Sequence, residues 1–163
     1  MKKKDLNKTF LKQINDIAHS KSLFTKLKKF NRQYSNFGEF INDFEVYLSD
    51  KIEPPPKNLS SQDQIFEAII LRLDTLSDYK NLAIKIYLET QKNPKYLPII
   101  NKYISNYFKG FLKSPFEFMT AYAVYIYAFN VWIEDSNSMD KTMAAIGNSF
   151  ENLNKFKNFL SPK

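Results

Sequence analysis

Apolar residues recur every three or four positions along nearly the whole chain, and no other feature constrains its fold as strongly. This spacing places side chains on one face of an α-helix, whereas a half-buried strand needs strict alternation. It occurs in segments near residues 5–19, 23–30, 37–48, 65–73, 79–87, 99–111, 115–133 and 138–157. Because the chain contains neither a long alternating run nor an internal repeat, the sequence predicts an all-α fold.

Prolines and polar residues mark the limits of these helices. The stretch EPPPKNLS, residues 53–60, contains three successive prolines, which remove backbone donors and favour extended backbone. We therefore expect a small N-terminal helical segment, 1–52, and a larger helical domain, 60–163. The residues predicted to cap the helices that follow them are Ser60 with Asp63, Ser114 before Pro115, and Asn137 or Ser138.

The amino-acid composition disfavours several kinds of functional site. Among 163 residues there are 15 Phe, 10 Tyr, three Gly and no Cys, which fits one substantial core and disfavours glycine-rich phosphate loops, disulfides and thiolate metal sites. The single histidine, His19, has no second imidazole with which to hold a metal. Glu134 and Asp135 diverge on a helix, so we interpret them as solvated residues of a link rather than an acid–base pair. The sequence therefore predicts no cofactor, no metal and no enzymatic activity.

Positive charge is concentrated near the N-terminus. Residues 1–34 hold ten Lys or Arg against two Asp, a net charge of +8, while the whole chain carries +7. The remaining 129 residues therefore carry a net charge of −1. Such an uneven distribution is typical of a surface that binds phosphates or an anionic membrane, although a solvated lysine face has the same composition.

Neither a membrane span nor a signal peptide is expected. The longest uncharged stretch, residues 118–133, is sixteen residues long and includes Thr120, Asn130 and three tyrosines. A spanning helix needs about 20 mainly apolar residues. The N-terminal lysines are not followed by the apolar core of a signal peptide. We therefore expect a soluble, cytoplasmic protein.

Two segments resemble the TetR family of transcriptional regulators. The first is NRQYSNFGEFI at residues 31–41, in which Tyr34 takes the aromatic position after the recognition helix and Ile41 takes a core position of the next helix. The second spans about residues 60–157 and is similar to the C-terminal regulatory domain of a TetR-like group, which is also the fold relative of the lipid-binding accessory protein of ubiquinone biosynthesis. Its resemblance is carried by Arg72, Asp74, Leu76, Tyr79, Lys80, Val131, Trp132, Asp135, Lys141, Thr142, Met143 and Ala144.

The resemblance implies a TetR-like helical bundle that regulates transcription. In such a protein the basic N-terminal helices bind duplex DNA through a helix-turn-helix, and the C-terminal bundle binds a small apolar ligand and forms a homodimer. With the basic charge, it places the candidate DNA contacts at Lys21, Lys26, Lys28, Lys29, Arg32, Gln33 and Tyr34. Helices near 115–133 and 138–157 are expected to form a four-helix dimer interface.

Aromatic residues at helical spacing are the candidates for an apolar ligand pocket. They are Phe66, Tyr103, Tyr107, Phe118, Tyr122, Tyr125, Phe129 and Trp132. A stripe of this kind is also typical of a plain core.

Two other interpretations of the function stay open here. One is a lipid- or isoprenoid-binding accessory protein that does not bind DNA and whose lysines contact a membrane peripherally; the other is an interaction protein with an ordinary core.

Overall fold

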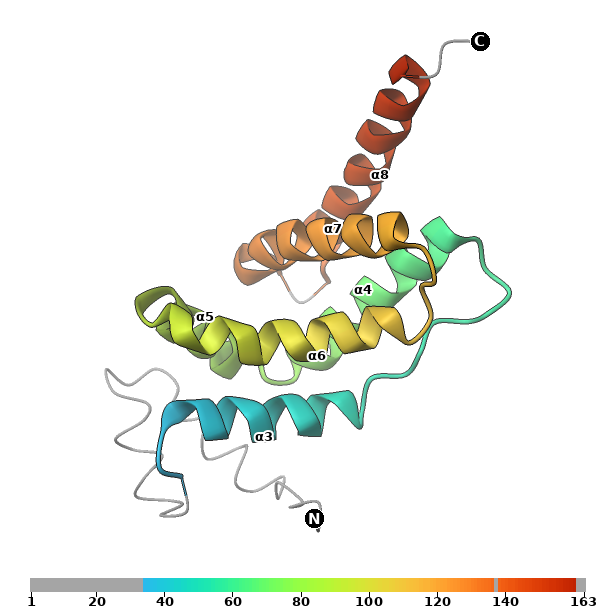
Figure 1. Ribbon diagram of the computed structural model, residues 1–163. Coiled ribbons are helices and arrows are strands. Elements are labelled where there is room, and N and C mark those ends of the chain that lie inside the picture. The colour runs from blue at the N-terminus through green and yellow to red at the C-terminus, as the bar shows by residue number, and fades with distance from the viewer. Residues whose placement is uncertain (1–33, 137, 161–163) are drawn as a thin grey trace. The chain divides into compact units, whose positions relative to one another are not determined.

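The computed structural model describes residues 34–136 and 138–160, and within them every regular element is a helix (Figure 1). The elements are α3 (Phe37–Ser49), α4 (Ser61–Ser77), α5 (Lys80–Lys92), the 3₁₀ turn η1 (Pro94–Tyr96), α6 (Leu97–Lys109), α7 (Pro115–Glu134) and α8 (Asp140–Leu160). The prediction of an all-α fold is confirmed. The helices expected near 5–19 and 23–30 lie outside the described residues.

Contacts group the chain into two units that differ from the predicted division into 1–52 and 60–163. The described part of unit 1 comprises residues 34–52 and 75–106, and that of unit 2 comprises 53–74 together with 107–136 and 138–160. The proline-rich stretch, which we expected to be a linker, lies at the start of unit 2. The difference arises because α4 and α6 each continue from one unit into the other.

Unit 1 is built around α3, whose start is fixed by a capping box. The Asn36 side chain accepts a hydrogen bond from the Glu39 amide at 3.1 Å, and the Glu39 carboxylate accepts one from the Ser35 amide at 2.8 Å. The helix then buries Phe40 and Phe44, whose rings stack with centroids 6.3 Å apart. Aromatic side chains spaced three or four residues apart along α3 therefore contribute to the core of this unit.

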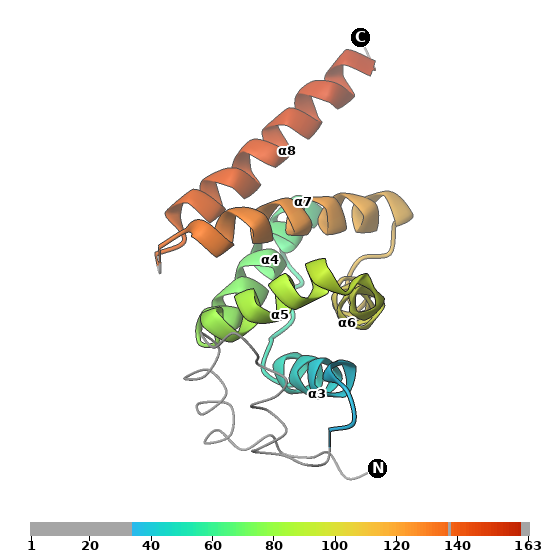
Figure 2. The ribbon, with the colours of Figure 1, turned by 90° about the vertical axis from the view of Figure 1, so that its left-hand side faces the viewer.

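Gly38 lets α3 approach α6 closely, and Figure 2 looks along α6 with α3 beside it. A Cβ atom on Gly38 would lie 3.1 Å from Ile99 Cδ1 and 3.3 Å from Tyr96 Cδ1. The Tyr103 hydroxyl on α6 donates to Asn42 Oδ1 on α3 at 2.8 Å. Gly38 and the Tyr103–Asn42 hydrogen bond thus both contribute to the contact between α3 and α6.

Pro98 lies inside α6, although the apolar pattern predicted that this helix begins only near residue 99. It is the second residue of α6, where an amide would have no carbonyl partner within the helix. The break falls at Asn93, where α5 ends, and the prolines instead begin the next helical segment.

In unit 2, α7 and α8 pack against each other and are joined by a short link whose described residues include Asp135. The C-terminal turns of α8 extend beyond α7 in both views (Figures 1 and 2). The core of the unit includes Ile69 on α4, Ala128 and Trp132 on α7, and Ile146 on α8, each fully buried.

Candidate functional site

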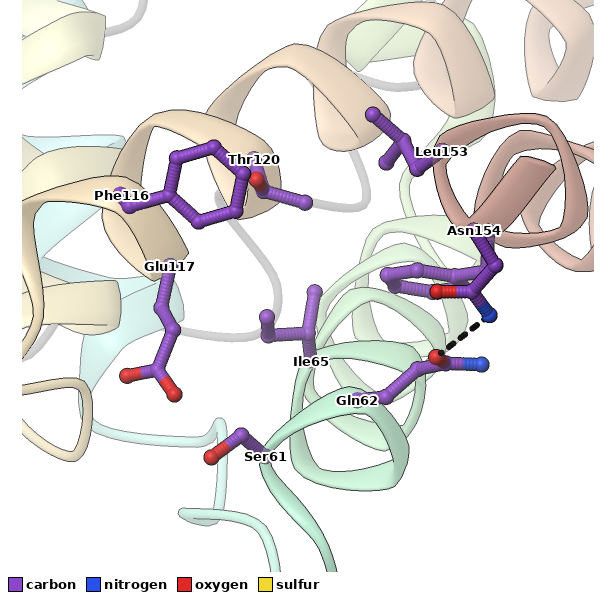
Figure 3. Close-up of a pocket in the computed structure, with 9 residues that line it drawn as sticks. Ser61, Gln62, Ile65, Phe116, Glu117, Thr120, Leu153 and Asn154 are labelled. Atoms are coloured by element: carbon purple, nitrogen blue, oxygen red, sulfur yellow. Dashed lines mark hydrogen bonds between the residues drawn. The ribbon is translucent and has the colours of Figure 1, made fainter. Parts of the chain in front are cut away.

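A cavity of about 180 Å³ lies in unit 2 where three helices meet (Figure 3). Each helix contributes three lining residues: Ser61, Gln62 and Ile65 from α4, Phe116, Glu117 and Thr120 from α7, and Phe150, Leu153 and Asn154 from α8. The walls are therefore mainly apolar, and hydroxyl, carboxamide and carboxylate groups lie among them. A cavity of this size is comparable to the roughly 150 Å³ that holds a benzene molecule in a protein core.

The start of α4 presents its lining residues because it is capped as predicted. The Ser60 hydroxyl accepts a hydrogen bond from the Asp63 amide at 3.2 Å and donates one to the Asp63 carboxylate at 2.6 Å. The helix therefore begins at Ser61, and Gln62 and Ile65, three residues apart, lie on one face.

The start of α8 is held by Asp135, which the sequence-based interpretation placed among solvated link residues. Asp135 is only 8% exposed, and its Oδ2 accepts hydrogen bonds from the Thr142 amide and the Thr142 hydroxyl, both at 2.7 Å. The predicted cap residue Ser138 instead donates to Asp140, and Asn137 lies outside the described residues. That interpretation of Asp135 was therefore wrong, because the residue caps the next helix from seven positions away.

The contacts of Asp135 favour its ionised form. Burial pushes the pKa of this carboxyl upward, but hydrogen bonds from Thr142 and from the Ser136 amide, with the positive charge of Lys141, outweigh burial and hold the pKa below its ordinary value. A carboxylate that accepts several N–H and O–H donors is an effective helix cap. It fixes the direction in which α8 leaves the link and so the position of Phe150 and Leu153.

None of the aromatic residues predicted to line a pocket lies among the described lining residues of this cavity. In unit 2, Tyr125, Phe129 and Trp132 pack in series with ring centroids 6.2 and 5.5 Å apart. Phe118 and Tyr122 stack at 6.2 Å. These rings pack along α7, where Tyr125 and Trp132 are buried and the other three are partly exposed.

The other three predicted aromatic residues are divided between the units. Tyr103 belongs to unit 1, where it bonds Asn42, while Phe66 on α4 in unit 2 is half-buried. The Tyr107 hydroxyl donates to the carbonyl of Glu53 at 3.1 Å or of Ala68 at 3.3 Å. Tyr107 thereby ties the proline-rich stretch and α4 to the last turn of α6.

The core of unit 2 also contains a fully buried arginine. Arg72 on α4 has no exposed surface, and its Nε donates to the Tyr125 hydroxyl at 3.1 Å. The guanidinium carbon lies 5.7 Å from the centre of the Tyr125 ring. Burial raises the pKa of the neighbouring Tyr107 phenol, and the positive charge of Arg72 only partly opposes that rise. Tyr107 therefore stays protonated and able to donate.

In unit 1, two tyrosines and a lysine form a second polar cluster. The Tyr47 and Tyr79 hydroxyls are 2.7 Å apart, and Lys51 Nζ lies 3.2 Å from the Tyr79 hydroxyl. Hydrogen bonds with Tyr47 and then Tyr79 raise the pKa of Lys51, and burial raises the pKa of Tyr79. The cluster joins the end of α3 to the start of α5.

Among the candidate DNA contacts, the structure describes only Tyr34. This residue is 4% exposed, packs edge-on against Phe40 with centroids 5.6 Å apart, and its hydroxyl donates to Asp43 at 3.2 Å. Burial first, and then the Asp43 charge, raise its pKa. Tyr34 thus belongs to the core of unit 1. The candidates outside the described residues are Lys21, Lys26, Lys28, Lys29, Arg32 and Gln33.

The described residues offer neither a metal cluster nor a membrane span. No group of three or more His, Cys, Asp or Glu within 34–136 and 138–160 is placed to hold a metal ion. No described helix combines the length and apolar character needed to cross a bilayer.

Comparisons with known proteins returned no match, whether with family models, with curated proteins or with solved structures.

Proposed function

We propose that the protein is a homodimeric, ligand-responsive transcriptional regulator of the TetR type. In this proposal residues 1–33 bind duplex DNA, and the helices of unit 2 bind a small, mainly apolar ligand and a second copy of the chain. The observation that carries it is the charge distribution: +8 in residues 1–34 against −1 in all the rest.

Phosphate binding is the use of this charge that elementary electrostatics favours. Lysine and arginine that neutralise DNA phosphates release condensed counterions, a gain that does not depend on base sequence. The nearly neutral remainder of the chain has no comparable charge of either sign, so the attraction is directed to one segment. Lys26, Lys28, Lys29 and Arg32 place four cations within seven residues that include no acidic residue.

The cavity in unit 2 supports the ligand-binding part of the proposal. Its apolar walls can bury a ring-sized group, and its polar groups can orient that group by hydrogen bonds. At about 180 Å³ the cavity is smaller than the roughly 300–1,000 Å³ typical of drug-sized ligands. Its volume therefore suits a compact, ring-sized group.

The exposed face of α7 supports dimerisation. Phe116, Met119, Ile126 and Tyr127 are 58%, 65%, 40% and 54% exposed. At about 100° per residue these four lie within an arc of about 100°, along about 16 Å of helix. Residues 118–133 carry no charge, so a two-fold contact centred on this stretch brings no like charges of α7 together.

The same exposed face favours one alternative. An exposed apolar helix face in a chain that also carries a strongly basic segment is a pattern found in proteins that lie on anionic membranes. A lipid-binding accessory protein without DNA affinity is therefore the second candidate function.

Binding of the full chain to duplex DNA and to anionic vesicles at low salt separates the two. Fluorescence anisotropy with a labelled random-sequence duplex and co-sedimentation with phosphatidylserine vesicles use the same protein stock. Tight, salt-sensitive DNA binding supports the regulator, whereas vesicle binding without DNA binding supports the lipid-binding protein. If the chain binds neither, the basic segment is a solvated face and both candidates fail.

A further inference from the structure

The polar groups around the cavity in unit 2 indicate which chemical class of ligand it accepts. We infer that the cavity binds a compact aromatic or branched apolar cation, such as an arylalkylammonium ion, with the ammonium group at Glu117. This inference rests on the ligand-binding part of the proposed function and adds the charge and size of the ligand.

Charge is the first reason. Among the side chains that the structure describes around the cavity, Glu117 is the one formally charged group, and none is Lys, Arg or His. A carboxylate beside apolar walls attracts a cation, and it repels an anion at a site from which water is partly excluded. In Figure 3 the Glu117 carboxylate and the Ser61 hydroxyl point toward the same edge of the cavity, which gives an ammonium group two oxygen acceptors.

The two helix ends that border the cavity do not reverse this preference. Helices α4 and α7 both begin beside it, and a helix N-terminus favours anions. Each first turn, however, already contains an acidic residue, Asp63 in α4 and Glu117 in α7. Asp63 is engaged in the cap with Ser60. Glu117 therefore remains as the charged acceptor that faces the cavity.

Apolar side chains on the opposite side of the cavity are the reason to expect a ligand with an apolar body. Ile65 and Phe150 are 3% and 5% exposed, and Leu153 lies across the cavity from Phe116 in Figure 3. Together these side chains can enclose one ring or one branched alkyl group. A longer chain exceeds the volume of about 180 Å³.

A weak hydrogen bond at the cavity provides a local reporter. Asn154 on α8 donates to Gln62 Oε1 on α4 at 3.3 Å, which is longer than the common range for such bonds. A ligand that enters between α4 and α8 changes the surroundings of both carboxamides. Their side-chain NH₂ signals in a ¹⁵N-correlated NMR spectrum therefore show whether binding occurs at this cavity.

Three probes with the same apolar body and different head groups test the inference: 2-phenylethylammonium, 2-phenylethanol and phenylacetate. Each has about nine or ten non-hydrogen atoms, so a dissociation constant in the high micromolar to millimolar range is expected for the best of them. In titrations of the full chain followed by NMR, the ammonium ion is expected to bind about tenfold more tightly than the alcohol, because a hydrogen bond to a charged group is stronger than a neutral one. Phenylacetate is expected to bind most weakly.

Two matched variants complete the test. Glu117→Gln keeps the shape of the side chain and should remove the advantage of the ammonium ion over the alcohol. Glu151→Gln changes an exposed carboxylate of α8 that does not line the cavity and should leave the advantage unchanged. Equal or tighter binding of the alcohol or the acid, or shifts that spare Asn154 and Gln62, would overturn the inference. If none of the three probes binds, the inference is overturned too. The proposed regulator is tested separately, by DNA binding and by the response of DNA binding to other ligands.

Discussion

Replacing Tyr125 with Phe should destabilise the protein far more than the same change at Tyr127, although both residues lie on α7. Tyr125 is 3% exposed and its hydroxyl accepts a hydrogen bond at 3.1 Å from Arg72, which is fully buried. Tyr127 is 54% exposed. Because the Tyr125→Phe variant keeps the ring, it keeps the packing on the guanidinium and removes one acceptor from a buried charged donor.

The expected cost follows from that contact. A hydrogen bond to a charged group contributes about 1.5–3 kcal/mol, and a buried donor that loses its acceptor cannot turn to water. For a chain of this size, this corresponds to a fall in Tm of about 3–12 °C. Tyr127→Phe should change stability by less than about 0.5 kcal/mol. Urea unfolding followed by circular dichroism, with thermal melts of the same samples, measures both.

A double-mutant cycle shows whether the buried charge is the cause. Replacing Arg72 with Met in the Tyr125→Phe background removes a buried cation and leaves apolar volume, a change that is often neutral or stabilising. The double variant should therefore be at least as stable as Tyr125→Phe alone. Equal effects of Tyr125→Phe and Tyr127→Phe, or simple additivity in the cycle, would refute the reasoning.

Three further predictions concern a cap, two glycines and the dimer. The folded protein holds the pKa of Asp135 below its ordinary value of 3.8, so the ionised carboxylate should contribute fully to stability above about pH 5. This contribution should be lost as the pH falls through the pKa of Asp135 in the folded protein. In acid unfolding, the free energy of unfolding of Asp135→Asn should therefore decrease less steeply with falling pH than that of the parent protein. Gly147→Ala adds a Cβ with no atom within 4 Å, so it should raise Tm by about 1–4 °C, whereas Gly38→Ala meets Ile99 and Tyr96 and should gain less or lose stability in thermal melts. Ile126→Glu should convert a dimer to a monomer in sedimentation velocity without lowering helix content; a monomeric parent protein would contradict the proposed interface.

The helices could be predicted from the sequence because each carries a periodic apolar stripe, and some also carry a local start signal. Not every predicted cap forms, since the Ser114 side chain makes no capping hydrogen bond at the start of α7. The stripe of Phe37, Phe40, Ile41 and Phe44 is buried in α3, and the Ser60–Asp63 cap forms as expected. Information of this kind is contained within one turn or two of the chain.

Features that depend on residues far apart could not be predicted. Asp135 caps α8 through Thr142, seven positions away, so no capping spacing identifies it. Arg72 meets Tyr125 across 53 positions. The cavity is formed by one face each of α4, α7 and α8, and its residues include none of the predicted aromatic set. The long aromatic stripe of α7 indicated the core, whereas the cavity lies beside smaller and polar residues such as Thr120 and Asn154.

The salt dependence of DNA binding tests the central claim most directly. The logarithm of the association constant should fall linearly with the logarithm of salt concentration, with a slope of about −0.9 per phosphate neutralised. Replacing Lys26, Lys28, Lys29 and Arg32 with Gln should make this slope less steep by about 3–4. A control with the same number of exposed lysines removed from the described helices and loops, Lys57, Lys92, Lys102 and Lys155, should keep the slope of the parent protein. Equal changes of slope in both variants, or no binding to duplex DNA at low salt, would contradict the account.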